Sequence, residues 1–201
     1  MSSMDSDTRT LLVTAAADLL DLGGPAAVTL REVGRRAGVS HNAPYKHFKS
    51  KEDLLAAIAS RELDRQSRAM GAAASKTGRP IEKLRRLMHG YIRWARAYPQ
   101  RFQLTFGPWT HQSQELGAAA SRSRARLIDL AHTAQHAGEL PPGNPERIAY
   151  LMLSLAHGAV DLALAGHLSA KGKGAADPEM LIDDLLSLLR PDPRRAQPSP
   201  S

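Results

Sequence analysis

The spacing of apolar residues constrains the fold of this chain more than any other feature of its sequence. Between Thr8 and Leu22, leucine and alanine recur at every third or fourth position, which places them on one face of an α-helix. The same spacing returns along the chain between breaks marked by glycine and proline. No convincing segment alternates apolar and polar residues as a half-buried strand does. The pattern therefore predicts an all-α protein.

About nine helices are expected, and each prediction has a start or stop signal. Thr29 and Glu32 are spaced as a capping box, and Ser50 begins a second N-cap signature. Gly23 is expected to take the left-handed conformation that ends the first helix. The helices are predicted over residues 8–22, 29–38, 40–48, 50–68, 80–97, 99–107, 113–137, 145–168 and 178–190.

The pattern loosens between residues 68 and 80, which indicates a boundary or hinge. We therefore expect an N-terminal domain over residues 1–66 and a larger helical domain over residues 67–190. Residues 1–7 and the polar, proline-rich tail 191–201 are expected to be disordered.

Composition narrows the class of protein. Hydrophobic residues make up 42% of the chain and aromatic residues only 4%, and alanine and leucine, which favour helices, dominate the apolar content. There is no cysteine, which excludes disulfides, thiolate zinc sites and cysteine nucleophiles. A net charge of +7 suits an anionic partner such as nucleic acid.

The sequence predicts a cytoplasmic, soluble protein with no membrane partner. Its first ten residues lack the basic start and apolar run of a signal peptide. No stretch approaches the roughly 20 apolar residues needed to cross a bilayer.

The segment from Thr29 to Leu55 carries the most specific functional signal. Two short helices joined by a glycine-containing turn make a helix-turn-helix, whose second helix is shaped to enter a major groove. Between residues 28 and 51, six basic residues stand against the single acid Glu32. Elsewhere in the first 66 residues, acidic side chains offset the basic ones, so positive charge is concentrated in this segment. The segment predicts a DNA-binding domain.

Its residues resemble those of the tetracycline-repressor (TetR) family of bacterial regulators. The resemblance covers residues 8–63 and rests on three motifs in register, which are T-x-R-x-V-G-x-x-A-G-V-S, Y-x-H-F and S-K-E-x-L-L. It implies a three-helix DNA-binding domain followed by a helical domain for dimerisation and ligand binding. It also implies a homodimeric, sequence-specific regulator, and a repressor in particular, that a small molecule releases from a near-palindromic operator in double-stranded DNA. No enzymatic activity and no cofactor are implied.

The resemblance makes residues 40–48 the recognition helix. The residues it implies at the DNA are Thr29, Arg31, Ser40, His41, Asn42, Ala43, Tyr45, Lys46, His47 and Lys51. Of these, His41, Asn42, Ala43 and Lys46 would face base edges, where asparagine suits adenine and lysine suits guanine. Thr29, Tyr45, His47 and Lys51 would hold phosphates, and Arg31 would reach a base or a phosphate.

Several residues of this segment have a plainer structural interpretation. Ala37, Val39 and Phe48 are expected in the core, Tyr45 and His47 also fit a packing role, and Arg35 and Arg36 also fit a solvated face. Pro44 stands where the family commonly has an apolar residue such as leucine. Because proline removes a backbone donor near the start of the recognition helix, it can change how that helix begins.

The second half of the chain is predicted to form the dimer and to bind an effector. The resemblance implies that the helices around 145–168 and 178–190 pair with their copies across a twofold axis. Their composition agrees, because they carry more apolar surface than one contact would bury. A small apolar or amphipathic effector would lie among the middle helices. The candidate ligand residues are Trp94, Phe102, Phe106, Trp109, Met152 and His157, and each also fits a plain core role.

Two other functional classes remain open at this level. A helical enzyme would need an acid–base pair, and His157 with Asp161, one helical turn apart, is the pair to test. A chromosome-coating protein would bind DNA with little sequence preference. No metal site is predicted, because His132 and His136 have helical metal spacing but no further ligand. Residues 166–174 fail the spacing of a phosphate-binding loop.

Overall fold

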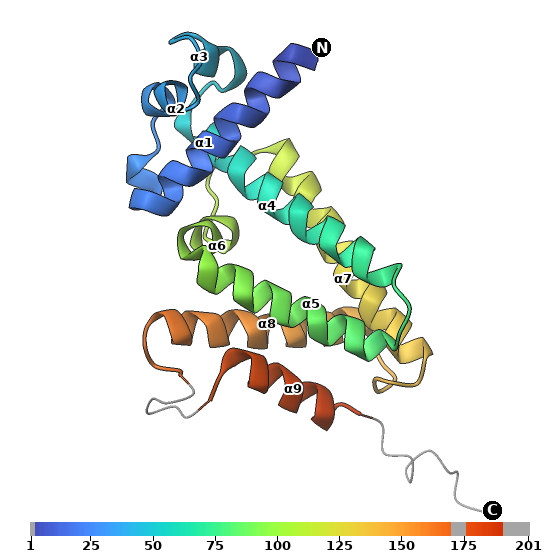
Figure 1. Ribbon diagram of the computed structural model, residues 1–201. Helices are drawn as coiled ribbons and strands as arrows, with labels where there is room; N and C mark the ends of the chain where they lie inside the picture. The colour runs from blue at the N-terminus through green and yellow to red at the C-terminus, as the bar shows by residue number, and fades with distance from the viewer. Residues whose placement is uncertain (1–2, 170–175, 191–201) are drawn as a thin grey trace, which may run out of the picture. The chain divides into compact units, whose positions relative to one another are not determined.

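The computed structural model describes residues 3–169 and 176–190, and within those ranges it contains nine α-helices and no strand. The prediction of an all-α fold is therefore confirmed. The helices belong to two compact units (Figure 1). The first unit comprises the residues up to Arg65 together with 98–122, and the second comprises 66–97 and the residues from Ser123 onward. The predicted tail 191–201 lies outside the described residues.

Helices α1 to α3 and their surroundings make up the first unit. Its helices are α1 (Ser3–Ala27), α2 (Leu30–Arg36), α3 (Ala43–His47), the first part of α4 (Lys51–Ala74), α6 (Pro99–Phe106) and the start of α7 (Gln114–His136). In Figure 1, α2 and α3 lie beside α1, and α1 also contacts α6. The apolar stripe of α1 is buried here, with Leu12 and Leu20 fully covered beside Val33 and Ile58. The stripe predicted from sequence therefore forms the core face of α1, except for Leu11, which is 52% exposed.

The end of the first helix differs from the prediction. α1 begins at Ser3, and its helical geometry breaks at Gly23 and Gly24 before a short turn at Pro25. Gly24, with φ of 64°, is the left-handed residue, and Gly23, with φ of −148°, is not. The assignment to Gly23 is wrong because proline disfavours helical geometry in the residue before it, which moves the break to Gly24.

Other helices also differ in length from the sequence prediction, and α8 (Pro145–Leu164), predicted over 145–168, is four residues shorter. The recognition helix, predicted over 40–48, is the five-residue helix α3, since Ser40 to Asn42 form the turn before it. α4 continues to Ala74 through the start of the predicted boundary. The remaining helices, α5 (Pro80–Ala97), α6, α7, α8 (Pro145–Leu164) and α9 (Pro178–Leu188), start within one residue of their predicted positions.

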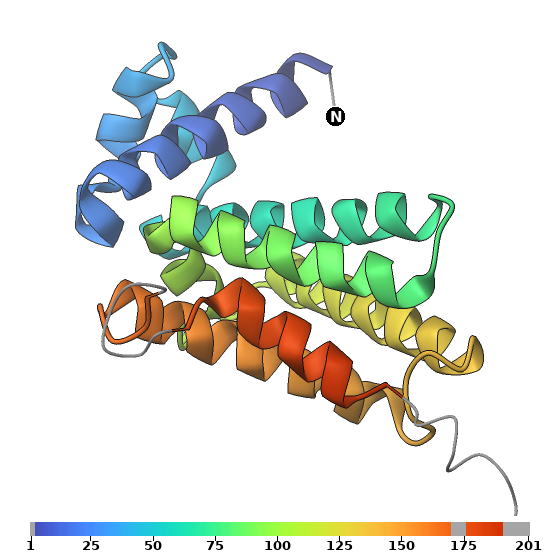
Figure 2. The same cartoon turned by 60° about the horizontal axis from the view of Figure 1, so that its bottom comes forward.

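The second unit is built on α5, α8 and α9, each of which contacts the other two. Figures 1 and 2 show α9 running alongside α8 and α5. Ile92, Met152 and Ile182 are each fully buried, one from each helix. Glu139, in the loop after α7, accepts hydrogen bonds from the Ile81 amide (2.8 Å) and from Arg79 Nε (2.7 Å). Glu139 therefore caps the start of α5 from almost sixty residues away in sequence.

α8 meets the length and composition test for a membrane-crossing helix, with 20 residues and a mean hydropathy of 1.3. No such stretch was expected from the sequence, because α8 is not an uninterrupted apolar run. It includes Glu146, Arg147 and Asp161. Core helices of soluble proteins pass the same test, and α8 contacts both α5 and α9. The finding is weak support for a membrane span.

Candidate nucleic-acid interface

The segment from Thr29 to Phe48 folds as a helix, a tight turn and a second helix. Thr29 caps α2, since its Oγ1 accepts from the Glu32 amide at 3.2 Å. The turn is closed by backbone hydrogen bonds from the Ala37 amide to the Val33 carbonyl and from the Val39 amide to the Gly34 carbonyl. Gly38, with φ of 65°, takes the left-handed conformation that lets the chain reverse there. The predicted helix-turn-helix is present in the first unit.

Only half of the predicted capping box forms. The carboxylate of Glu32 turns away from the Thr29 amide and pairs with Arg35, whose Nη2 lies 2.5 Å from Glu32 Oε1. The hydrogen bond from Arg35 lowers the pKa of Glu32 below its ordinary value, and the charges of Arg35, Arg36 and Arg31 act in the same direction. Arg36 lies 3.7 Å from Asp18 on α1. Both arginines thus have partners within the chain, which favours the plainer interpretation for them.

Pro44 holds the two helices of the motif in contact. It occupies the first turn of α3, where a missing amide costs no helical hydrogen bond, and its side chain is buried. A Cβ built on Gly34 of α2 would lie 2.8 Å from Pro44 Cγ. Glycine at 34 is therefore what admits proline at 44, and the proline ring sets how closely α3 approaches α2.

The residues implied at the DNA are mostly exposed. Seven of the ten, which are Thr29, Arg31, Ser40, His41, Asn42, Tyr45 and Lys46, are exposed, and Ala43, His47 and Lys51 are half-buried. The rings of His41 and Tyr45 lie 5.9 Å apart on one side of α3. Phe48 is 3% exposed, and Ala37 and Val39 pack partly buried against the same core. The motif therefore directs its apolar side chains inward and leaves its polar and basic side chains facing solvent.

The start of α4 is fixed by its own caps. Ser50 Oγ accepts from the Asp53 amide at 3.1 Å, and the Asp53 carboxylate accepts from the Lys49 amide at 3.0 Å. His111, from the segment before α7, places its Nε2 2.9 Å from the other Asp53 oxygen. These contacts hold Lys51 at the first position of α4, beside the helix-turn-helix.

The predicted ligand residues are divided between the two units. Phe102, Phe106 and Trp109 belong to the first unit, where the rings of Phe102 and Phe106 lie 5.8 Å apart. Trp94, Met152 and His157 belong to the second. There, Tyr91 Oη lies 3.0 Å from His157 Nδ1, and His157 Nε2 lies 3.5 Å from Asp161. Burial, together with the charge of Asp161, raises the pKa of the Tyr91 phenol well above its ordinary value, so the hydroxyl keeps its proton.

A small pocket lies between α5 and α9 in the second unit. It is lined by Ile81, Glu82, Arg85, Asp183, Leu186, Ser187 and Arg190. None of these was among the predicted ligand residues. Its lining alternates charged and apolar side chains, and Arg85 is already paired with Glu82.

α8 and α9 present large apolar side chains to solvent. The exposed ones are Tyr150, Leu151, Leu162 and Leu164 on α8, and Met180 and Leu188 on α9. Leu188 is 84% exposed. The small residues Ala156 and Ala159 of α8 are buried within the chain's own core. Apolar side chains exposed on neighbouring helices mark α8 and α9 as a candidate interaction surface.

The histidine pair noted in the sequence lies on the surface of α7. His132 and His136 are exposed on α7 with ring centroids 6.4 Å apart. Among the residues described, no group of three or more potential ligands gathers to hold a metal ion. Residues 166–174, which fail the phosphate-loop spacing, fall partly outside the described ranges.

Comparison with known proteins gives two family matches. Residues 12–58 match the model of bacterial regulatory proteins of the tetR family, and residues 84–189 match the tetracyclin repressor-like C-terminal domain. No curated protein matches this sequence.

Similar solved structures cover nearly the whole chain. A protein of unknown function from Rhodococcus sp. RHA1 is 26% identical, with a TM-score of 0.76 over 90% of this chain and 93% of its own. A TetR/AcrR-family transcriptional regulator from Thermobifida fusca is 23% identical, with a TM-score of 0.68 over 94% and 100%. AibR, solved with isovaleryl coenzyme A and operator DNA, is 18% identical, with a TM-score of 0.64 over 92% and 98%.

Proposed function

Because this chain belongs to the tetR family of bacterial transcriptional regulators, we propose that it is a homodimeric repressor, released from a near-palindromic operator by a small molecule. Family members are DNA-binding regulators and not enzymes, so the pair of His157 and Asp161 is set aside as a catalytic site. The observation that carries the proposal is the helix-turn-helix, whose exposed surface holds the basic residues of the segment 29–51. The proposed division of labour places DNA binding in residues 1–66 and dimerisation and effector binding in residues 67–190.

The DNA contacts follow from exposure and chemistry. Lys46 and Asn42 on and before α3 are exposed and can reach base edges, where they hydrogen-bond to guanine and adenine. Arg31 on α2 reaches a base or a phosphate, and Thr29, Tyr45, His47 and Lys51 hold phosphates. Base contacts set the sequence preference, whereas phosphate contacts strengthen binding to every sequence.

The dimer forms through α8 and α9. Their exposed leucines lie on neighbouring helices, and a second copy that covers them removes apolar surface from water at about 25 cal/mol per Å². A twofold dimer presents two recognition helices roughly 34–36 Å apart, which is one turn of DNA. The operator is therefore a near-palindrome with half-sites one turn apart.

The effector is a small apolar or amphipathic molecule. In the second unit, Trp94 and Met152 suit an apolar body and His157 suits a polar group. Phe102, Phe106 and Trp109 offer apolar surface of the same kind within the first unit. AibR is bound to isovaleryl coenzyme A, so acyl-coenzyme A esters are the first compounds to test. An effector weakens operator binding by no more than its difference in affinity for the two conformations of the dimer. We place this regulator in the cytoplasm, where its DNA is.

Selection of binding sequences from a random pool of DNA duplexes tests the DNA-binding proposal. The wild-type protein is expected to enrich a near-palindrome. Lys46→Ala is expected to change which bases are enriched. Lys51→Ala is expected to weaken binding to all sequences alike and to lower the salt dependence of the binding constant by about one phosphate contact. Arg126→Ala, an exposed basic residue on α7, is the charge-matched control and leaves binding unchanged. Binding without sequence preference would favour the chromosome-coating alternative.

Sedimentation tests the dimer. Leu151→Glu places a charge on the exposed face of α8 and is expected to convert the dimer to a monomer that binds the selected duplex poorly. Leu22→Glu is the matched control, because Leu22 is 73% exposed but lies at the end of α1. A wild-type protein that is monomeric at working concentration contradicts the dimer, and with it the near-palindromic operator.

A further inference from the structure

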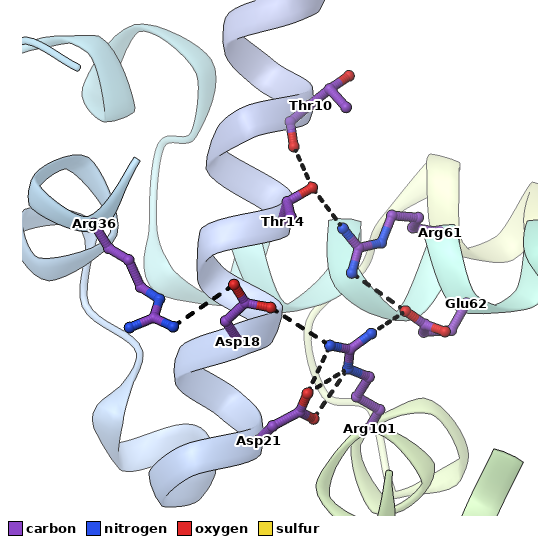
Figure 3. A network of polar contacts seen from close by, with 8 residues as sticks. All are labelled: Thr10, Thr14, Asp18, Asp21, Arg36, Arg61, Glu62 and Arg101. Carbon is purple, nitrogen blue, oxygen red and sulfur yellow. Dashed lines mark hydrogen bonds and ion pairs between the residues drawn. The ribbon is translucent and has the colours of Figure 1, made fainter. Parts of the chain in front are cut away.

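A cluster of charged side chains lies inside the first unit, beside its apolar core. Arg101 on α6 is 8% exposed, and Glu62 on α4 is 1% exposed. Figure 3 shows Arg101 between the carboxylates of α1 and α4. Its Nε and Nη2 donate to Asp21 at 3.0 and 2.6 Å, and its Nη1 donates to Glu62 at 3.2 Å. One buried guanidinium thus joins three helices.

The cluster continues to the helix-turn-helix through Asp18. Asp18 on α1 lies 3.8 Å from Arg101 on one side and 3.7 Å from Arg36 on the other (Figure 3). Arg36 is the last residue of α2. A chain of charges therefore runs from α6, across α1, to the first helix of the DNA-binding motif.

A second branch ties α4 to α1. Arg61 on α4 lies 3.3 Å from Glu62 and donates to Thr14 Oγ1 on α1 at 3.1 Å, and Thr14 in turn donates to the Thr10 carbonyl at 2.9 Å. Counting both branches, three guanidinium groups face three carboxylates (Figure 3). The cluster is therefore formally neutral, which permits its burial.

The hydrogen bonds of Arg101 depend on direction, whereas the apolar contacts of the surrounding core do not. Burial acts to lower the pKa of Arg101, but its hydrogen bonds to Asp21 and the charges of Asp21 and Glu62 outweigh burial and raise that pKa above its ordinary value. The guanidinium therefore stays charged, and its planar fork accepts only a narrow range of carboxylate positions. Apolar contacts have no preferred direction, whereas the hydrogen bonds of the guanidinium group require Asp21 and Glu62 at defined positions.

We propose that Arg101 is a positioning residue for DNA binding, one that fixes α1 against α4 and, through Asp18, sets the orientation of α2. The inference rests on the function proposed above. Arg101 itself is 8% exposed and makes no DNA contact in this scheme. It acts through α1, which contacts α2, α3 and α6.

The test compares operator affinity with stability in four variants of the full-length protein. Arg101→Met removes the fork and the charge, and Arg101→Lys keeps the charge alone. Asp18→Asn breaks only the link toward α2, because Asp18 is half-exposed and its loss leaves Asp21 and Glu62 on Arg101. Arg122→Met is the matched control, since Arg122 makes an ion pair with Asp64 (2.8 Å) between α7 and α4 of the same unit but outside the cluster. The probe is a 30-bp duplex, about three helical turns, enriched by the wild-type protein, and a shuffled duplex measures non-specific binding.

If Arg101 positions the helix-turn-helix, its variants lose sequence-specific binding beyond what their lower folding stability explains. Well below each variant's melting temperature, Asp18→Asn and Arg101→Lys are expected to weaken binding to the enriched duplex about tenfold and to the shuffled duplex less than twofold. The double variant Asp18→Asn/Arg101→Lys is expected to bind no worse than Arg101→Lys alone, because both changes break one path. Arg122→Met binds both duplexes as the wild type does.

Three outcomes overturn the inference. Unchanged operator affinity in Asp18→Asn and Arg101→Lys, with only the melting temperature lowered, reduces the cluster to a structural role. If the losses of operator affinity add in the double variant, Asp18 and Arg101 act independently. An equal loss of affinity in Arg122→Met shows that any ion pair of this unit has the same effect. If Arg101→Met does not fold, the two milder variants still decide the matter. A wild-type protein that enriches no sequence contradicts the proposed function and not this inference.

Discussion

The two units of the molecule are packed in different ways. The first unit places a charged cluster beside its apolar core, with Glu62 and Arg101 almost fully covered. The ion pairs of the second unit include exposed ones such as Arg93 with Glu179. Its core contains flexible side chains, among them Met70, Met88 and Met152. Among the residues whose side chains the structure describes, every buried methionine belongs to the second unit.

The difference matches part of the work that we propose, since the helix-turn-helix lies in the first unit, and Trp94, Met152 and His157, three of the six proposed ligand residues, lie in the second. Buried ion pairs demand one geometry, which suits a unit that must present a helix to DNA in a fixed orientation. Methionine is unbranched and fills irregular space, so a core rich in it adjusts to a bound molecule at little cost. The comparison thus predicts a rigid first unit and an adaptable second unit.

The two tryptophans of the chain allow each unit to be followed separately. Trp109 belongs to the first unit and Trp94 to the second. In the Trp94→Phe background, fluorescence during denaturation reports the first unit, and in the Trp109→Phe background it reports the second. The predictions below use these two backgrounds.

The largest effect is expected from Arg101→Met. It leaves the carboxylates of Asp21 and Glu62 without their main partner, and breaking a buried pair from one side costs about 3–5 kcal/mol of stability. The matched change in the second unit, Arg93→Met, removes an exposed pair with Glu179 and is expected to cost at most about 1 kcal/mol. Urea denaturation measures both, and equal costs would erase the contrast between the units.

A smaller effect is expected from Gly34→Ala. The added methyl group would meet the Pro44 ring at 2.8 Å, and overpacking of this kind costs about 1–3 kcal/mol. Gly90→Ala in α5 is the control, since nothing lies within 4 Å of the added atom, and it is expected to gain about 0.5–1 kcal/mol from helix propensity. Replacement of Pro44 by alanine alongside Gly34→Ala should restore much of the loss. A destabilised Gly90→Ala would mean that the second unit is as tightly packed as the first.

The smallest effect concerns Glu139 in the second unit. Glu139→Gln weakens the cap on α5, which costs about 1 kcal/mol. Burial alone would raise the pKa of Glu139, but the Ile81 amide and Arg79 outweigh it and hold that pKa below the ordinary 4.5. The carboxylate's contribution is therefore present above about pH 4.5 and is lost as the pH falls through the lowered pKa. In the Trp109→Phe background, the melting temperature should fall as the pH is lowered from 6 to 3. The part of this fall that is due to Glu139 should be missing when Glu139→Gln is added.

Sequence alone predicted the helices well because their signals are local. The starts of α5, α8 and α9 each carry a proline at the first helical position, and the spacing of leucine and alanine sets the rest. The left-handed glycine was placed one residue early at Gly23, since the influence of Pro25 on Gly24 was overlooked. The recognition helix was predicted too long, because its turn residues Ser40 to Asn42 have no distinct signal.

The charged cluster could not be predicted in the same way. Arg101 meets Asp21 across 80 residues and Glu62 across 39, and an arginine on a short helix is most often exposed. A signal did exist, since Asp18 and Asp21 stand one turn apart at the edge of the apolar stripe of α1. The exposed residues implied at the DNA, in contrast, follow from a contiguous motif, and their roles there remain predictions.

The contact between Gly34 and Pro44 has a consequence for protein engineering. One way to transfer the operator preference of this chain to a related regulator would be to graft the residues of its recognition helix. Such a graft would separate Pro44 from Gly34, which it contacts in this chain. A recipient with alanine or a larger residue at position 34 cannot accommodate Pro44 without displacing α3 from α2. Gly34 and Pro44 should therefore be transferred together, so the smallest exchangeable cassette is the whole segment from α2 to α3.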